Sequence, residues 1–175
     1  MVSSLRAYLG GVFGAAPERG LTPGEVALLP PAFARVLPLG DIRLVGRAHN
    51  PFALGKILVR GRRIFWPDVP GDMASSGVGL QGLLAHELAH VWQYETGRLS
   101  AAGYLRRPAN WVYRYIPGEP FDTYGIEAQA DIIQDWWRMR RGLRPVRWNE
   151  SPPDPGWLEA EVETAFTRPP RYPRG

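Results

Sequence analysis

The sequence predicts a small α+β domain with a short sheet within residues 41–66 and two long helices at 80–96 and 123–141. Short β-forming runs beside glycines indicate the sheet, and apolar residues at helical spacing indicate the helices. The chain of 175 residues, with 45% hydrophobic and 22% charged side chains, suits one globular domain. We therefore expect residues 1–167 to form a single domain and the Pro/Arg-rich residues 168–175 to form a flexible tail.

The composition excludes several classes of protein. Because cysteine is absent, the chain has no disulfide, no cysteine-bound metal and no cysteine nucleophile. No apolar run approaches the ~20 residues of a membrane helix, so we expect no membrane association. The net charge is +4, but the arginines are spread along the chain, so we expect no nucleic-acid partner. The first residues do not resemble a signal peptide, which predicts a cytoplasmic protein and leaves export by a dedicated secretion system open.

Two short helices are predicted before the sheet. Thr22 suits an N-cap, Pro23 suits the first helical position, and Glu25 completes a capping box. Pro30-Pro31 must end this helix, and residues 32–36 have the pattern of a second one.

The predicted sheet begins with a strand at 41–47, which is rich in β-forming side chains. Residues 56–59 and 62–66 then flank Arg60-Gly61 and predict a hairpin. Residues 67–79 contain prolines, glycines and serines, so we expect a loop there.

The helical half follows. Leu84, Leu88 and Val91 form an apolar stripe on the helix at 80–96, and Gly97 suits its end. A short helix is predicted at 109–115. The helix at 123–141 has the following apolar positions: Ile126, Ala130, Ile133 and Trp137. A last helix over residues 154–166 is predicted to begin with Asp154 as its cap.

The strongest functional signal is the H-E-x-x-H pattern of His86-Glu87-Leu88-Ala89-His90. Residues four apart lie on one face of a helix, so both imidazoles can reach one metal ion. Glu87 then lies beside the metal, where it can accept a proton from water rather than bind the ion. The pattern therefore predicts a zinc (Zn²⁺) site within the first long helix.

A catalytic zinc needs a third protein ligand and an open position. The metzincin pattern is absent, because this chain has Gln93 and Thr96 where that pattern requires glycine and histidine. Glu95 is rotated by roughly 140° from His90 around the helix axis, so it cannot easily meet the same ion. Two candidates remain, which are His49 near the end of the predicted strand and Glu127 on the second long helix.

We favour Glu127 because it begins an E-x-x-x-D pattern that ends at Asp131. The two carboxylates share one face of the helix. If Glu127 binds the metal, Asp131 is placed to accept a hydrogen bond from the free ring N–H of a ligand histidine, which fixes the orientation of that ring.

H-E-x-x-H followed after a spacer by E-x-x-x-D resembles the gluzincin group of zinc metallopeptidases. Residues 84–93, Tyr124 with residues 127–130, and residues 21–25 also resemble small bacterial zincin-like domains associated with polymorphic toxins and type VI secretion (Vgr-related proteins). This second resemblance covers residues 21–141.

The resemblance implies a zincin-like fold, zinc as cofactor and a peptide or protein as substrate. It implies His86, His90 and Glu127 as ligands, Glu87 as general base, and a secretion-system partner. Large gluzincins carry a further tyrosine or histidine that stabilises the oxyanion, and this short chain has no second lobe to supply one. Tyrosines near the second helix are the candidates, with Tyr124 first, and the others are Tyr104, Tyr113 and Tyr115. The alternative function is a non-catalytic zinc module of a secretion or toxin system.

Overall fold

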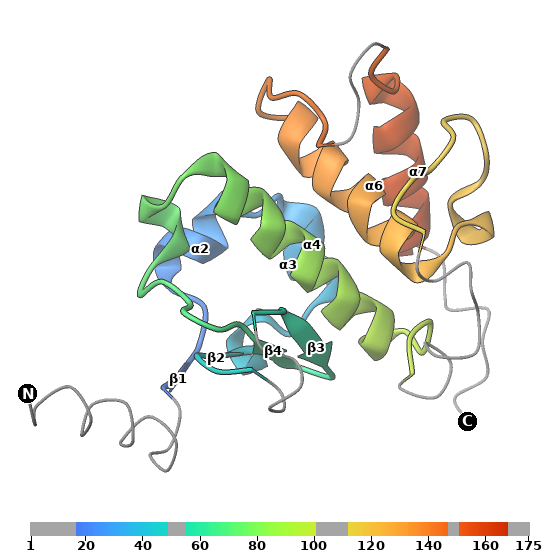
Figure 1. Cartoon of the computed structure of the whole chain (residues 1–175). Coiled ribbons are helices and arrows are strands. Elements are labelled where there is room, and N and C mark those ends of the chain that lie inside the picture. The colour runs from blue at the N-terminus through green and yellow to red at the C-terminus, as the bar shows by residue number, and fades with distance from the viewer. Residues whose placement is uncertain (1–16, 49–54, 101–111, 147–150, 168–175) are drawn as a thin grey trace, which may run out of the picture.

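The computed structural model describes residues 17–48, 55–100, 112–146 and 151–167. Its architecture is α+β in a small single domain, as predicted. Helix α4 lies between a four-stranded sheet on one side and helices α6 and α7 on the other (Figure 1). None of the helices in the described ranges is both long and apolar enough to cross a bilayer.

The sheet has the strand order β1-β2-β4-β3, with the bounds β1 Glu18–Arg19, β2 Arg43–Val45, β3 Leu58–Arg60 and β4 Arg63–Phe65. Strands β2 and β4 run parallel, and the two outer pairs are antiparallel. The middle residues of β2, β3 and β4 are Leu44, Val59 and Ile64, which lie side by side across the strands and are buried in the core. The sheet thus forms where the sequence predicts it, with shorter strands and with the additional strand β1.

The hairpin between β3 and β4 turns one residue later than predicted. The turn consists of Gly61 and Arg62, not Arg60 and Gly61. Gly61 has a φ of +59°, a left-handed conformation that glycine adopts without a steric penalty. The single glycine therefore fixes the position of the turn.

Helices α2 (Pro23–Leu28) and α3 (Pro31–Val36) confirm the two short predicted helices. The capping box is formed, since Thr22 Oγ1 accepts from the Glu25 amide at 3.0 Å and Glu25 Oε2 accepts from the Thr22 amide at 2.8 Å. Glu25 also accepts two hydrogen bonds from the Arg19 guanidinium, at 2.7 and 2.8 Å, and one from the Met73 amide at 2.9 Å. This carboxylate ties together β1, α2 and the short 3₁₀ helix η3 (Met73–Ser75), which lies in the predicted loop.

The long helices are α4 (Val78–Glu95), α6 (Ile126–Met139) and α7 (Pro155–Thr167). Helix α4 begins two residues earlier than predicted, and α6 is shorter than predicted at both ends. Its later start follows from the 3₁₀ helix η5 (Phe121–Thr123), which takes up the first predicted residue. Asp154 caps α7 as predicted, accepting from the Trp157 amide at 2.8 Å.

The prediction of a helix at 109–115 is wrong for residues 112–115, which form no regular structure. Tyr115 instead lies flat against Trp157, and its hydroxyl bonds to α6, so tertiary contacts outweigh local propensity here. Residues 109–111 and the tail at 168–175 lie outside the described residues.

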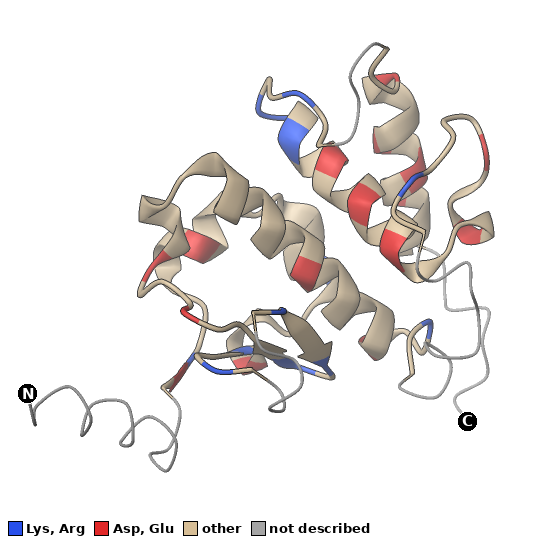
Figure 2. Cartoon of the chain, viewed as in Figure 1, with Lys and Arg blue, Asp and Glu red and all other residues tan. Residues whose placement is uncertain are grey.

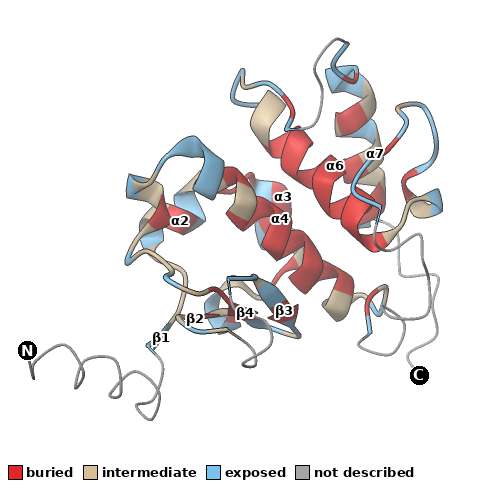
Figure 3. Ribbon diagram, in the orientation of Figure 1, coloured by how far each residue is buried: buried red, intermediate tan, exposed pale blue. Residues whose placement is uncertain are grey.

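The core lies on both sides of α4, and Figure 3 shows α4 and α6 buried along most of their length. The predicted apolar stripe of α4 is fully buried, as are the predicted inner positions of α6 apart from a small exposure of Ile126. The helices pack closely at Gly82, where a Cβ would be in van der Waals contact with Gln134 Nε2 at 3.4 Å and with the Trp137 ring at 3.6 Å. This close packing of α4 on α6 positions the candidate site.

Candidate metal centre

Three predicted ligands meet between α4 and α6. Glu127 Oε2 lies 3.4 Å from His86 Nε2 and 3.3 Å from His90 Nε2. One ligand atom from each of these residues lies within 4.8 Å of the others, and all three residues are buried. The two imidazoles stand edge to face, with ring centroids 4.9 Å apart. The structure therefore brings together two nitrogens and one carboxylate oxygen at a single point.

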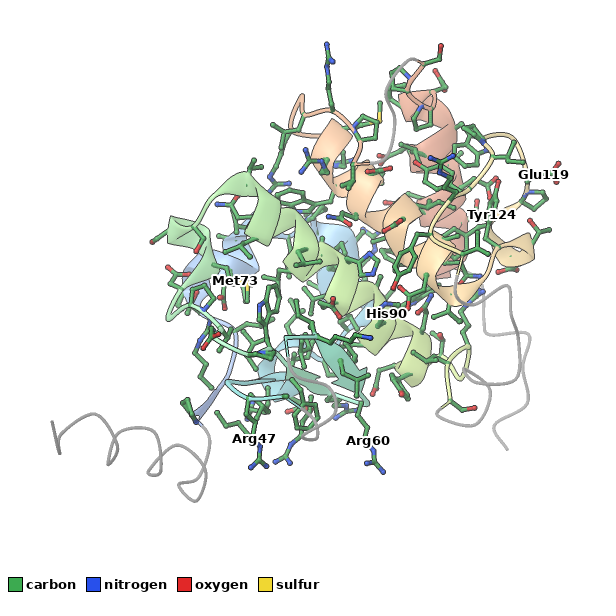
Figure 4. All side chains as sticks on the ribbon, in the orientation of Figure 1. Arg47, Arg60, Met73, His90, Glu119 and Tyr124 are labelled. Carbon is green, nitrogen blue, oxygen red and sulfur yellow. The ribbon has the colours of Figure 1, made fainter. Side chains whose placement is uncertain are left out.

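The positions of these donors follow from the helices that carry them. His86 and His90 are one turn apart on α4, and His90 is labelled on that helix in Figure 4. Glu127 lies in the first turn of α6, which packs against α4. The remaining acidic side chains of α6, Asp131 and Asp135, follow at intervals of four residues, so they lie on the same side of the helix.

Asp131 lies behind His86, on the side of the ring away from Glu127. Its Oδ1 is 3.0 Å from His86 Nδ1, although the geometry falls short of a linear hydrogen bond. Burial lowers the pKa of His86, but Asp131, Glu127 and Glu87 outweigh burial and raise that pKa to about 10. The negative potential of these three buried carboxylates therefore favours positive charge at this site, which a divalent cation would supply.

Glu87 lies beside the three donors on α4 and is itself buried. Burial raises the pKa of Glu87, the imidazoles of His90 and His86 lower it, and Glu127 raises it again, with a net upward shift. A carboxyl group with a raised pKa binds protons more readily near neutral pH, as a general base requires.

The sequence interpretation missed one residue that touches the donors. Gln93 is fully buried, and its Oε1 lies 2.8 Å from His90 Nδ1. We considered it above only as a departure from the metzincin pattern. Its spacing of three residues from His90 on a helix was the available signal, because residues three apart share a face.

Among the described residues, the other side chains considered as ligands or oxyanion donors make their hydrogen bonds and ion pairs with residues other than the three donors. The hydroxyl of Tyr124, which is labelled in Figure 4, donates to the carbonyl of Ile116, and the hydroxyl of Tyr115 donates to Asp135 at 2.8 Å. Glu95 forms an ion pair with Arg62 at 2.9 Å. His49 and Tyr104 lie outside the described residues, and Tyr113 is exposed.

Asp135 lies two turns beyond Glu127 on α6 and is almost fully buried. It accepts hydrogen bonds from the Tyr115 hydroxyl at 2.8 Å and the Val146 amide at 2.7 Å. Burial raises the pKa of Asp135 to about 6, despite those two bonds. This carboxyl group holds two irregular segments against α6.

In the comparison with known proteins, no family model matches the chain. In an alignment 131 residues long that covers 68% of this chain, the sequence is 30% identical to the type VI secretion system spike protein VgrG2b of Pseudomonas aeruginosa. The chain spans only 13% of the length of that protein.

A solved structure, the effector domain of the same Pseudomonas aeruginosa VgrG2b, has a similar fold. It superposes with a TM-score of 0.58 at 22% identity, covering 93% of this chain and 91% of that one. At this identity the likeness shows the fold. The chain is therefore related in sequence to a Vgr-related protein of type VI secretion and shares the fold of that protein's effector domain.

Proposed function

We propose that the protein is a zinc metallopeptidase of the gluzincin type that acts as an effector of a bacterial type VI secretion system. The observation that carries the proposal is the buried group of His86, His90 and Glu127 with Glu87 beside it. The relationship to a spike protein supports a secretion-system partner, and a peptide or protein is the proposed substrate.

The donor set fits zinc. Two imidazole nitrogens and one carboxylate oxygen are the ligands of many catalytic zinc sites, which leave a fourth position open. The excess of buried carboxylates around the imidazoles also fits a doubly charged cation. When bound, zinc supplies a Lewis acid that polarises a substrate carbonyl and makes water more acidic.

The protein's own residues then perform the proton transfers. Glu87 accepts a proton on its carboxylate from the attacking water and delivers it to the nitrogen of the departing amine. Its raised pKa suits both steps, because a base must bind the proton and an acid must release it near the same pH. Asp131 holds the ring of His86 so that Nε2 faces Glu127.

The second candidate is a zinc-containing accessory module without turnover. One observation favours it: the hydroxyl of Tyr124, the first candidate for the oxyanion donor, is bonded to the Ile116 carbonyl. Against it, a structural zinc site has no use for a buried glutamate with a raised pKa beside its ligands. We therefore place the peptidase first.

Zinc binding by Glu127→Ala tests the ligand set. We expect about one zinc per chain in the wild type and a loss of affinity well beyond ~100-fold in the variant, because a ligand is removed and not merely a supporting group. Glu95→Ala is the control, since Glu95 pairs with Arg62. Unchanged zinc affinity in Glu127→Ala would place the third ligand elsewhere, and the next residues to test are His49 and Asp122, a carboxylate in the 3₁₀ helix η5 just before α6.

Turnover separates the two candidate functions. The wild type, loaded with zinc, is incubated with a mixed peptide library and with denatured proteins, and the cleavage products are identified by mass spectrometry. Cleavage that disappears in Glu127→Ala supports the peptidase. Stoichiometric zinc without cleavage of any substrate supports the accessory module.

A further inference from the structure

Two glutamine side chains are buried between α4 and α6 beside the three donors. Gln93 of α4 is 0% exposed and Gln129 of α6 is 4% exposed. Gln93 Nε2 donates to Gln129 Oε1 at 3.1 Å. A buried amide pair in a helix interface is retained only where its hydrogen bonds are satisfied, so the partners at each end show what the pair does.

The far end of this pair fixes its direction. Gln129 Nε2 donates to the carbonyls of Phe121 and Tyr124, at 3.3 and 3.0 Å. A carbonyl can only accept, so the amino group of Gln129 must face these two residues. The oxygen of Gln129 must then face Gln93.

The same argument continues through Gln93. Its amino group lies between two acceptors, Gln129 Oε1 and the carbonyl of Ile126 at 3.0 Å. Its oxygen must therefore face His90 Nδ1, which lies 2.8 Å away. An amide oxygen cannot donate, so Nδ1 of His90 must carry the hydrogen. In the neutral ring, Nε2 then presents its lone pair, 3.3 Å from Glu127 Oε2.

We infer that Gln93 and Gln129 form an amide relay that holds His90 in the Nδ1–H tautomer and fixes α4 against the first turn of α6. The relay connects the helix that carries both histidines to backbone carbonyls just before Glu127 in the chain. It therefore sets the tautomer of His90 and the position of Glu127. Gln93 is a positioning residue. The expected effect of Gln93 on metal affinity rests on the proposed zinc site, whereas the tautomer of His90 does not depend on it.

The relay differs from the support of the other histidine. His86 Nδ1 faces the carboxylate of Asp131, whereas His90 Nδ1 faces a neutral amide. A second carboxylate at this position would add negative charge to a site that already holds three. An amide orients the ring without that charge, and it keeps the proton on His90 because a neutral amide is a poor base.

Zinc affinity measures the positioning role. Gln93→Leu removes the acceptor of His90 and replaces the glutamine with an apolar residue of similar size, and we expect zinc affinity to fall by about 10–100-fold. Gln134→Leu is the matched control, because Gln134 is also a buried glutamine of the α4–α6 interface but lies near Gly82. Thermal unfolding of both metal-free variants checks that they fold. Wild-type affinity in Gln93→Leu, or an equal loss in Gln134→Leu, would overturn the positioning role.

The tautomer of His90 can be measured in the metal-free wild type, so the inference can be tested even if Gln93→Leu does not fold. Long-range ¹H–¹⁵N spectra identify which ring nitrogens carry a hydrogen. The chain has three histidines, and His90→Ala assigns the ring. We expect a hydrogen on Nδ1 of His90, whereas free neutral histidine prefers Nε2–H, and a His90 ring without a hydrogen on Nδ1 would refute the relay. Because this measurement needs neither zinc nor turnover, it separates a failure of the relay from a failure of the proposed function.

Discussion

Glu25 and Glu87 are both buried glutamates on helices, but their surroundings are opposite. Glu25 accepts from the Arg19 guanidinium and from the amides of Thr22 and Met73. Burial works to raise the pKa of Glu25, but these donors outweigh burial and lower it. Glu87 lies near the middle of α4, and the helix has one other acidic residue, Glu95 at its end, and no Lys or Arg, so it is mostly tan in Figure 2. We find no hydrogen-bond donor bonded to Glu87 in the described part of the chain, and burial raises its pKa.

The difference shows that burial alone does not identify a functional carboxylate. A buried carboxylate that is surrounded by donors is stabilised in its charged form and serves the fold. A buried carboxylate without such donors, placed beside a group of metal-ligand atoms, binds a proton more readily and is available for chemistry. The four substitutions below test this distinction, from the largest expected effect to the smallest.

Glu87→Gln has the largest expected effect, on catalysis alone. Glutamine keeps the size of the side chain but cannot accept the proton, so turnover should fall by about 10²–10⁴-fold while zinc content and thermal stability stay near the wild-type values. Activity and zinc are measured on the same preparation, with Glu95→Gln as control. Equal turnover in variant and wild type would refute Glu87 as the base, and loss of zinc would make it part of the metal site.

Glu25→Gln should affect the fold alone. The glutamine amide would face the Arg19 and Met73 donors with one acceptor oxygen fewer than the carboxylate. We expect the free energy of unfolding to fall by about 3 kcal/mol. This value is at the lower end for a broken buried ion pair, because Arg19 is partly exposed. The pKa of Glu25 is lowered by folding, so this contribution is present above about pH 4.5 and is lost as the pH falls. Chemical denaturation at neutral and acid pH measures it.

The control for Glu25→Gln is Glu163→Gln, which breaks an exposed ion pair with Arg35 at 2.8 Å. An exposed pair contributes little, so stability should stay within about 1 kcal/mol of the wild type. Equal stability losses in the two variants would contradict a special structural role for Glu25.

Asp131→Asn tests a carboxylate between the two extremes. It removes the charge behind His86 without removing a ligand, so zinc affinity should fall by about 10–100-fold. Competition with a chelator measures the affinity, and Asp135→Asn, one turn farther along α6, is the control. Wild-type affinity in Asp131→Asn would show that this carboxylate does not support the metal site.

Asp135→Asn should change the pH dependence of stability. Folding raises the pKa of Asp135 from 3.8 to about 6, so the folded state binds more protons and wild-type stability falls as the pH rises through that window. The loss should be at most about 2 kcal/mol, after allowance for residual solvation. Asparagine can accept from Val146 and donate to the Tyr115 oxygen, so the variant should fold and lack this fall. Parallel curves for variant and wild type between pH 4 and 6 would contradict the assignment.

Local patterns in the sequence predicted much of the molecule. The capping box at Thr22, the two long helices and the pairing of His86 with His90 all depend on residues within a few positions of one another, so spacing reveals them. Strand β1 was missed because Glu18–Arg19 is too short to show alternation, and its partner β2 is distant in the sequence.

The relay of Gln93 and Gln129 was missed for a related reason. Each glutamine is unremarkable in its own helix, and the pair acquires a role only when α4 and α6 pack together. Glu127 could be predicted from the sequence because the E-x-x-x-D pattern lies within one helix, and the structure places it beside the two histidines. Tyr124 as the oxyanion donor remains a prediction, since no local rule distinguishes it from neighbouring tyrosines.

The origin of the three donors on two helices has a consequence for the order of assembly. One helical turn places His86 beside His90, whereas residues 91–126, a loop of 36 residues, must close before Glu127 joins them. Closing a loop of that length costs about 3 kcal/mol in chain entropy. The buried apolar faces of α4 and α6 offset this cost when they pack. If the three donors bind an ion as proposed, we expect this packing to bring them together, so that little of the binding energy of the ion is consumed in ordering the chain.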